Sequence, residues 1–325
     1  MGDDMAEELT ETPLKTPRTF LNFPLINDFD DFCADIAILG VPFGRAYSVD
    51  GMANDQSLAP DHIRSWSTLT EIEMTLNNYD FDLGGTLLDG KDINVVDCGN
   101  VKSSLVNPNE HYDSAEQVAR KIFAANSVLI ILGGDHGVPI PIMKALGVLD
   151  KEITLIHIDA HLDWRDEING EKNGYSSVIR RASELSFIKN IHQIGMRGIG
   201  SAKTKEVNDA IAHGCTITTA YQLHDIGMDE VLNSIPDGGT YYLTIDADGI
   251  DPTIMPAVLA QTPGGLNWVQ LHKLIHGLVN KGRVVGMDLV EITPSCDVGN
   301  ISMIHAERLL CNFIGATVRA GYYNK

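Results

Sequence analysis

Short apolar runs alternate along the chain with longer segments in which apolar residues recur at helical spacing. The runs are rich in β-branched residues and have no polar face, which is typical of parallel strands covered by helices on both sides. We expect strands at residues 35–40, 93–97, 127–132, 153–158, 190–195, 215–218, 241–245 and 283–289.

Between these runs, four segments place apolar residues three and four positions apart, which predicts amphipathic helices. These helices are expected at residues 114–126, 139–149, 177–186 and 268–280. A chain that alternates strands with helices forms right-handed crossover connections. We therefore predict an α/β protein with three layers, α/β/α, built around one doubly wound, mainly parallel sheet.

The 325 residues are long enough to bury a large core, and no low-complexity linker divides them. We expect a single domain over residues 21–325. Residues 1–20 begin with an acidic stretch that lacks an apolar segment, so we expect a flexible tail rather than a secretory signal.

The formal net charge of −20 makes nucleic acid and anionic membrane surfaces poor partners, because both attract basic patches. No apolar run of about 18 residues predicts a membrane span. The five cysteines are scattered and odd in number, which favours reduced thiols and a cytoplasmic protein over a disulfide framework.

Polar residues of similar chemistry directly follow three of the predicted strands. In open parallel sheets, ligands bind beyond the carboxyl ends of the strands, where such residues would meet. The three segments are GGDHG (133–137), DAHLD (159–163) and DADGIDP (246–252). Their candidate ligands are His136, Asp159, His161, Asp163, Asp246 and Asp248.

The spacing within these segments brings side chains together, because residues two apart in an extended chain point to the same side. Each segment alone has an ordinary interpretation as a turn or a helix cap. Together they supply two imidazoles and four carboxylates, more ligands than one four-coordinate zinc ion needs. We therefore predict two divalent metal ions. Such a pair activates water for attack on esters, amides, phosphates or amidines, and the ligands alone do not choose among them.

The three motifs in this order resemble the ureohydrolases, which include arginase, agmatinase and guanidinobutyrase. Further similar stretches are GVP (40–42), DCGN (97–100), QIGMRG (193–198), TPGGL (262–266) and MDLVE (287–291), so the resemblance runs from about residue 35 to the C-terminus. It implies an arginase-like fold, a small guanidino substrate, and a homo-oligomer, a trimer or hexamer. A hetero-oligomer is also compatible with it.

The resemblance also implies roles for individual residues. One metal ion would be held by His136, Asp159, Asp163 and Asp246, and the other by Asp159, His161, Asp246 and Asp248. Asp163 would also orient the attacking water, and Glu291 would bind the guanidinium group through its carboxylate. The family usually holds Mn²⁺, and some relatives that act on small guanidines use Ni²⁺; two imidazoles suit either ion.

Three departures from the family pattern bear on the substrate. Tyr175 stands where the family has a histidine that protonates the leaving amine or binds substrate, and a phenol is a weaker acid near neutral pH. Residues 256–261 (PAVLAQ) are bulkier and more apolar than the family segment, and the loop at residues 50–60 also differs. These departures favour a small or alkylated guanidine or a biguanide, such as guanidine, dimethylguanidine or metformin.

An agmatinase or guanidinobutyrase is the main alternative. Two further hypotheses come from other classes: a deacetylase-like hydrolase with one zinc ion, and a non-catalytic subunit of a hetero-oligomer. The histidines outside the motifs, His111 among them, are expected to lie on the surface or to be hydrogen-bonded in the core.

Overall fold

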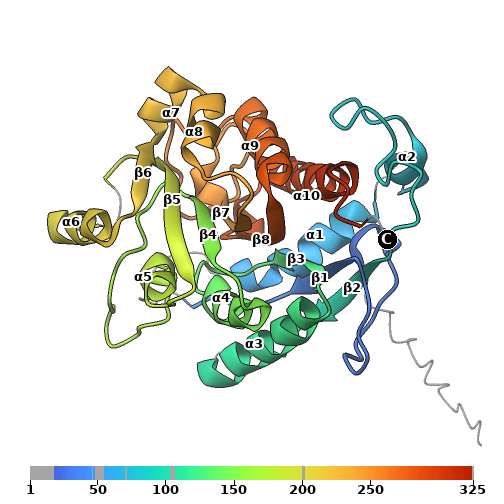
Figure 1. Ribbon diagram of the computed structural model, residues 1–325, viewed down its shortest axis with the longest axis horizontal. Coiled ribbons are helices and arrows are strands. Elements are labelled where there is room, and N and C mark those ends of the chain that lie inside the picture. The colour runs from blue at the N-terminus through green and yellow to red at the C-terminus, as the bar shows by residue number, and fades with distance from the viewer. Residues whose placement is uncertain are drawn as a thin grey trace, which may run out of the picture.

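The computed structural model describes residues 18–45, 47, 55–69, 72–102, 107–199 and 202–323. Its eight strands form one parallel sheet in the order β2-β1-β3-β8-β7-β4-β5-β6 (Figure 1). They are β1 (Ile36–Gly40), β2 (Val95–Asn100), β3 (Val128–Leu132), β4 (Ile153–Ile158), β5 (Ile188–Met196), β6 (Thr216–Thr219), β7 (Thr240–Asp246) and β8 (Arg283–Val290). Each lies at a predicted apolar run, with ends shifted by a few residues at most.

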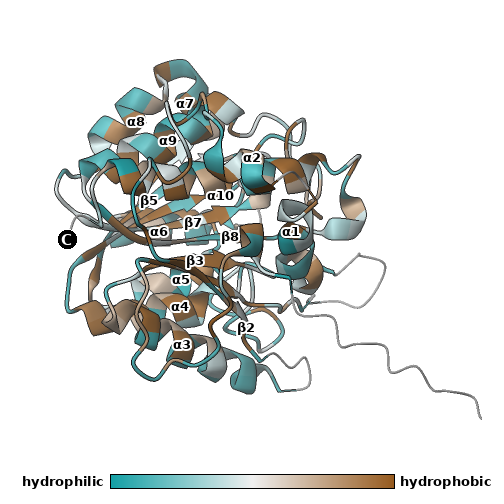
Figure 2. Cartoon of the chain, turned by 90° about the vertical axis from the view of Figure 1, so that its right-hand side faces the viewer, coloured by the Kyte–Doolittle hydropathy of each residue, from teal (hydrophilic) through white to brown (hydrophobic). Residues whose placement is uncertain are grey.

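Helices cover both faces of the sheet, which confirms the predicted α/β/α layers (Figure 2). One face carries α3 (Pro108–Ala124), α4 (Pro139–Ala145), α5 (Val178–Ser183) and α6 (Thr204–His213). The other carries α1 (Ala59–Ser67), α7 (Ala220–Ile226), α8 (Met228–Ser234), α9 (Trp268–Lys281) and α10 (Ile301–Arg319). A short helix, α2 (Ile72–Asn77), has no buried residue.

The alternation of side chains along each strand divides the core into two clusters. In β1, Ile36 and Ile38 pack against one helix layer, while Ala37 and Leu39 pack against the other. Every residue of β1 is buried, because both faces of the strand are covered. The central strands therefore form a rigid base whose carboxyl ends all lie at one edge of the sheet.

Helix boundaries differ from the predictions in instructive ways. The helix expected from residue 114 begins at Pro108, since proline suits the first helical turn, where its missing N–H is not needed. The helix expected at residues 139–149 is α-helical only to Ala145 and ends in a 3-10 turn, Leu146–Leu149. Among the described residues, every helix is too short or too polar to span a membrane.

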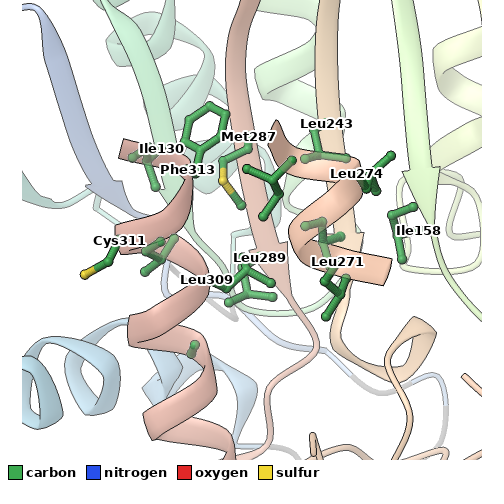
Figure 3. Close-up of a cluster of buried hydrophobic side chains, with 14 of the residues drawn as sticks. Ile130, Ile158, Leu243, Leu271, Leu274, Met287, Leu289, Leu309, Cys311 and Phe313 are labelled. Atoms are coloured by element: carbon green, nitrogen blue, oxygen red, sulfur yellow. The ribbon is translucent and has the colours of Figure 1, made fainter. Parts of the chain in front are cut away.

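The long helix α10 was not indicated by the spacing of apolar residues. It packs beside α9 over the central strands, with Phe313 and Leu309 directed toward β3 and β8 (Figure 3). Every residue from Leu309 to Val318 is buried. Because this C-terminal half is buried on all sides, apolar residues occur on every face of it, and an amphipathic spacing does not stand out.

Most of the tail expected at residues 1–20 lies outside the described residues. Its last residue, Phe20, is fully buried, and its backbone N–H donates a 2.8 Å hydrogen bond to the carboxylate of Asp97. The same carboxylate forms a two-pronged ion pair with Arg64 of α1, with N–O distances of 2.9 Å. The start of the described chain is thus tied to the edge of the sheet at β2.

The expectation that His111 is on the surface or hydrogen-bonded in the core was wrong. The side chain is fully buried in α3, and neither ring nitrogen has a hydrogen-bond partner among the described residues. Its ring stacks on that of Phe43, with centroids 4.2 Å apart. This imidazole therefore packs as an aromatic ring does, and burial lowers its pKa to about 4.

Candidate functional site

Four adjacent central strands, β3, β8, β7 and β4, deliver the predicted site residues to one edge of the sheet. Ile158 of β4 pairs with Ile245 of β7, so Asp159 and Asp246 follow side by side. Asp246 in turn pairs with Val290 of β8, the residue before Glu291. Strand register therefore sets the position of each carboxylate before any loop contributes.

Two site residues adopt a backbone conformation that is unusual for residues other than glycine. The φ angles of Asp163 and Glu291 are 51° and 63°, in the left-handed region. That conformation costs about 1–2 kcal/mol per residue and concentrates at functional sites. Glu291 directly follows β8, and Asp163 ends the DAHLD segment that follows β4. The left-handed conformation turns the chain at both residues, so each carboxylate reaches the space beyond the sheet.

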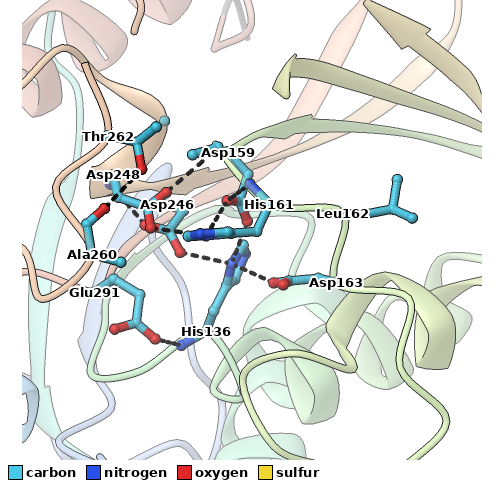
Figure 4. Close-up of polar contacts among 12 residues, drawn as sticks. His136, Asp159, His161, Leu162, Asp163, Asp246, Asp248, Ala260, Thr262 and Glu291 are labelled. Atoms are coloured by element: carbon cyan, nitrogen blue, oxygen red, sulfur yellow. Dashed lines mark hydrogen bonds and ion pairs between the residues drawn. The ribbon is translucent and has the colours of Figure 1, made fainter. Parts of the chain in front are cut away.

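The structure brings all six candidate metal ligands together (Figure 4). The Nδ1 atom of His136 lies 3.1 Å from a carboxylate oxygen of each of Asp159, Asp163 and Asp246. On the other side of Asp159, the Nδ1 atom of His161 lies 3.4 Å from its second oxygen and 3.0 Å from Asp248. Asp159 thus stands between two groups of donor atoms, one around each imidazole.

The four aspartates are buried close together, which disfavours their charged forms. Burial, and then the charge of Asp159, raise the pKa of Asp163 to about 7. Burial, and then the charges of Asp248 and Asp159, hold the pKa of Asp246 well above its usual value. Divalent cations would relieve this repulsion, since they favour the ionised carboxylates that ligate them.

The surroundings of His136 indicate that these six side chains suit metal cations. Its buried Nδ1 atom makes no hydrogen bond to any described residue, although three carboxylate oxygens lie 3.1 Å away. Nitrogen and oxygen donors that surround a common point without bonding to each other are placed as ligands of an ion. Two groups of donors that share Asp159 fit two divalent ions.

Contacts behind the ligands orient them. The Nε2 atom of His136 lies 3.0 Å from the hydroxyl of Thr244, which donates a 2.7 Å hydrogen bond to Asp288. Because that hydroxyl donates to Asp288, it accepts from His136, and the proton of the imidazole sits on Nε2. Nδ1 is then left with its lone pair, as a metal ligand requires.

His157 is a site residue that the sequence reasoning missed. It is fully buried in β4, and its Nε2 atom lies 2.8 Å from Asp159. It stood inside an apolar run and was counted as part of a strand. The signal was present, however, because His157, Asp159, His161 and Asp163 follow one another at the two-residue spacing that predicts a shared side.

A cavity of about 820 Å³, part of it open to solvent, lies against the candidate ligands. Glu291 and Tyr175 both line it, with the ring of Tyr175 4.3 Å from that of Tyr47. Its remaining lining residues are Arg45, Gln56, Asp135, His136, His161, Asp163, Ser176, Asp246, Asp248, Val258, Leu259 and Ala260. Three of the apolar residues that depart from the family pattern are therefore in the wall. Residues 50–52 of the other departing loop lie outside the described residues.

Glu291 is held at this cavity from two sides. Its Oε1 atom accepts a 2.8 Å hydrogen bond from the backbone N–H of His136, and its Oε2 atom accepts one of 3.1 Å from Gln56. Burial, and then the charge of Asp135, raise the pKa of Glu291 to about 8. A cation in the cavity would favour the ionised form, so the site suits a positively charged ligand.

Comparison with known proteins agrees with these features. A sequence model of the arginase family matches residues 34–315. An agmatinase of Citrobacter koseri is 31% identical over 293 residues, which are 89% of this chain and 90% of that protein. A guanidinobutyrase of Pseudomonas aeruginosa is 29% identical over 294 residues, 88% of each chain. The structure of a proclavaminate amidino hydrolase from Streptomyces clavuligerus superposes with a TM-score of 0.80 at 25% identity, covering 94% of this chain and 98% of that one.

Proposed function

Because the chain belongs to the arginase family, we propose that it hydrolyses a small or alkylated guanidine or a biguanide. Enzymes of this family are ureohydrolases, which cleave C–N bonds other than peptide bonds in linear amidines and depend on two metal ions. Water adds to the central carbon of the guanidino group, the bond to the leaving nitrogen breaks, and urea or a urea derivative is released with an amine. The convergence of two imidazoles and four buried carboxylates beside Glu291 carries this proposal.

We infer that the six clustered side chains hold the metal ions. One ion would take His136, Asp159, Asp163 and Asp246, and the other would take Asp159, His161, Asp246 and Asp248. Two adjacent divalent ions, Mn²⁺ or Ni²⁺, would supply Lewis-acid activation of a water molecule near neutral pH. The shared contacts of Asp159 with both imidazoles support its assignment to both ions.

The remaining residues would position the reactants. Glu291, anchored through two hydrogen bonds, would pair with the planar guanidinium group and hold its carbon beside the ligand cluster. Asp163 would accept a hydrogen bond from the attacking water and so orient it. Tyr175 lines the same cavity, and burial raises its pKa, so its phenol would remain protonated as a hydrogen-bond donor toward the leaving nitrogen.

The cavity wall supports a preference for small or alkylated substrates. Val258, Leu259 and Ala260 present apolar surface that suits methyl or other alkyl substituents. Arg45 is the one arginine or lysine among the described lining residues; although it lies 3.6 Å from Glu171, it would disfavour an ammonium tail placed beside it. Because two relatives are an agmatinase and a guanidinobutyrase, agmatine and 4-guanidinobutyrate are the alternative substrates.

A substrate panel tests this proposal. Release of urea or a urea derivative, and of ammonia or the amine, would be measured for guanidine, N,N-dimethylguanidine, metformin, agmatine and 4-guanidinobutyrate, with Mn²⁺ and Ni²⁺ supplied separately. The proposal expects the highest kcat/KM for one of the first three. Turnover of agmatine or guanidinobutyrate far above all of these would contradict the preference while leaving the reaction class intact.

Two other hypotheses give different results in the same assays. A deacetylase-like enzyme would bind one zinc ion per chain and release no urea. A non-catalytic subunit would need a partner chain, and Asp163→Asn in this chain would leave the activity of the assembly unchanged. We expect instead a catalytically competent homo-oligomer, a trimer or hexamer, in which that substitution abolishes urea release.

A further inference from the structure

Gln56 occupies an unusual position for a residue outside every motif. It opens the 3-10 turn Gln56–Leu58 ahead of α1, yet its side chain is only 2% exposed and lines the cavity. Its Nε2 atom donates a 3.1 Å hydrogen bond to Oε2 of Glu291, a residue 235 positions away. A glutamine on a short turn is thus brought to the carboxylate that faces the ligand cluster.

The contact with Glu291 fixes which end of the amide faces the carboxylate. With a guanidinium cation bound, Glu291 is ionised and only accepts hydrogen bonds, so the NH₂ group of Gln56 then points toward it. The amide oxygen, Oε1, then points elsewhere, and it is buried with no hydrogen-bond partner among the described residues. A buried acceptor without a hydrogen bond is unfavourable, so we expect Oε1 to accept a hydrogen bond from a bound ligand.

Glu291 alone cannot satisfy a guanidinium group. Each of its oxygens already accepts one hydrogen bond, from His136 and from Gln56, which leaves a single further lone pair on each. A guanidinium carries N–H donors on all three nitrogens, fixed in one plane. Once Glu291 has taken one edge, another N–H must find a separate acceptor or lose its hydrogen bond on leaving water.

We propose that Gln56 is a substrate-binding residue whose Oε1 atom accepts an N–H of the guanidinium group held by Glu291. This inference rests on the proposed function. Glu291 supplies the negative charge that pairs with the guanidinium. Gln56 favours substrates in which the adjacent nitrogen carries a hydrogen that can be donated to Oε1. A nitrogen with two alkyl groups has no donor for this oxygen. N,N-dialkylguanidines therefore bind with an unsubstituted nitrogen toward Gln56 and the alkylated nitrogen away from it.

Two substitutions separate this role from simple support of Glu291. Gln56→Leu removes both the donor and the acceptor. Gln56→Glu removes the donor to Glu291 but keeps an oxygen acceptor for the cation. Kinetics would be measured with the best substrate of the panel, alongside metal content and melting temperature. Gln117→Leu, which changes an exposed glutamine of α3, is the matched control.

We expect Gln56→Leu to raise KM by about 10- to 100-fold, because a hydrogen bond to a charged group is lost, with kcat changed by less than about 3-fold. Gln56→Glu is expected to keep KM within about 5-fold of the wild type, since the acceptor remains. Gln117→Leu should match the wild type throughout.

Either of two results overturns the inference. One is an unchanged KM in Gln56→Leu. The other is a KM for Gln56→Glu as high as that for Gln56→Leu, which would mean that only the support of Glu291 matters. Both results require a wild-type enzyme that releases urea; a wild type that hydrolyses no guanidino compound would instead refute the proposed function. A variant that loses metal or stability is replaced by Gln56→Met, to which the same KM criterion applies.

Discussion

The imidazole of His136 and the hydroxyl of Thr244 lie 3.0 Å apart at the base of the candidate site. Thr244 belongs to β7 and is fully buried, and its hydroxyl donates a 2.7 Å hydrogen bond to Asp288 of β8. The hydroxyl of Thr244 and the carboxylate of Asp288, on two paired strands, therefore set both the orientation and the tautomer of His136.

Replacing Thr244 tests whether these hydrogen bonds to His136 matter for metal binding. Thr244→Val has nearly the same shape but cannot accept the proton of His136, so the affinity for Mn²⁺ or Ni²⁺ should fall by about 10- to 100-fold. Thr244→Ser keeps the hydroxyl and should bind metal like the wild type. Isothermal titration calorimetry on the metal-free proteins measures both affinities. Equal values for the valine and serine variants would show that the hydrogen bond between Thr244 and His136 does not affect metal binding.

The charge of Glu291 is expected to matter more than its shape. Glu291→Gln can still accept the hydrogen bond from the backbone of His136, but it has no charge to balance a guanidinium. We expect kcat/KM to fall by about 10- to 100-fold, since a charge-assisted hydrogen bond is lost. Glu116→Gln on α3 serves as the control. A kcat/KM within 2-fold of the wild type would exclude Glu291 from substrate binding.

The ion pair between Arg64 and Asp97 is expected to stabilise the edge of the sheet, since both side chains are almost fully buried. Arg64→Met would leave Asp97 buried without its partner, which should lower the free energy of unfolding by about 3–5 kcal/mol. Adding Asp97→Asn removes the unpaired charge and should recover part of that loss. Urea unfolding measures all three proteins, and a loss below about 1 kcal/mol in the single variant would refute the prediction.

His111 should make folding stability depend on pH. Its pKa is about 4 in the folded protein, against an ordinary value of 6.5, because burial disfavours the charged ring. Between these values the unfolded chain binds more protons, so stability falls as the pH falls from 6.5 toward 4. The contribution is about 2 kcal/mol less stability at pH 5 than at pH 7.5.

The variant His111→Phe keeps the stacking on Phe43 without a titratable ring. The difference in unfolding free energy between variant and wild type should therefore shift in favour of the variant by about 2 kcal/mol between pH 7.5 and pH 5. Chemical unfolding at the two pH values measures it. A difference that stays constant with pH would show that His111 is not held neutral.

The strands could be predicted from sequence because their apolar character is local. Ile153–Ile158 is mostly apolar and is followed at once by the DAHLD segment, so both the strand and the site at its end were visible. The helices were harder, because α10 is buried on all sides over its C-terminal half, Leu309–Val318, where helical spacing does not stand out. Its place in the fold depends on packing against α9 and the central strands, which the spacing of its own apolar residues does not reveal.

The site residues also include some that could be predicted from the sequence and some that could not. His136 and the aspartates stand in motifs with regular spacing, and the structure places them together. Gln56 stands in a loop without a motif, and its importance depends on a contact with Glu291 that only the folded chain creates. The nitrogens of His111, which have no hydrogen-bond partner in the described part of the chain, were invisible for the same reason, since burial is a property of the surrounding residues.

The most direct test of the two-metal account is a titration of metal-free protein with Mn²⁺ or Ni²⁺ while urea release from the best guanidino substrate is followed. The account predicts that activity rises until two ions are bound per chain and then stays constant. Saturation at one ion per chain, or no release of urea or a urea derivative from any guanidino compound with two ions bound, would contradict it.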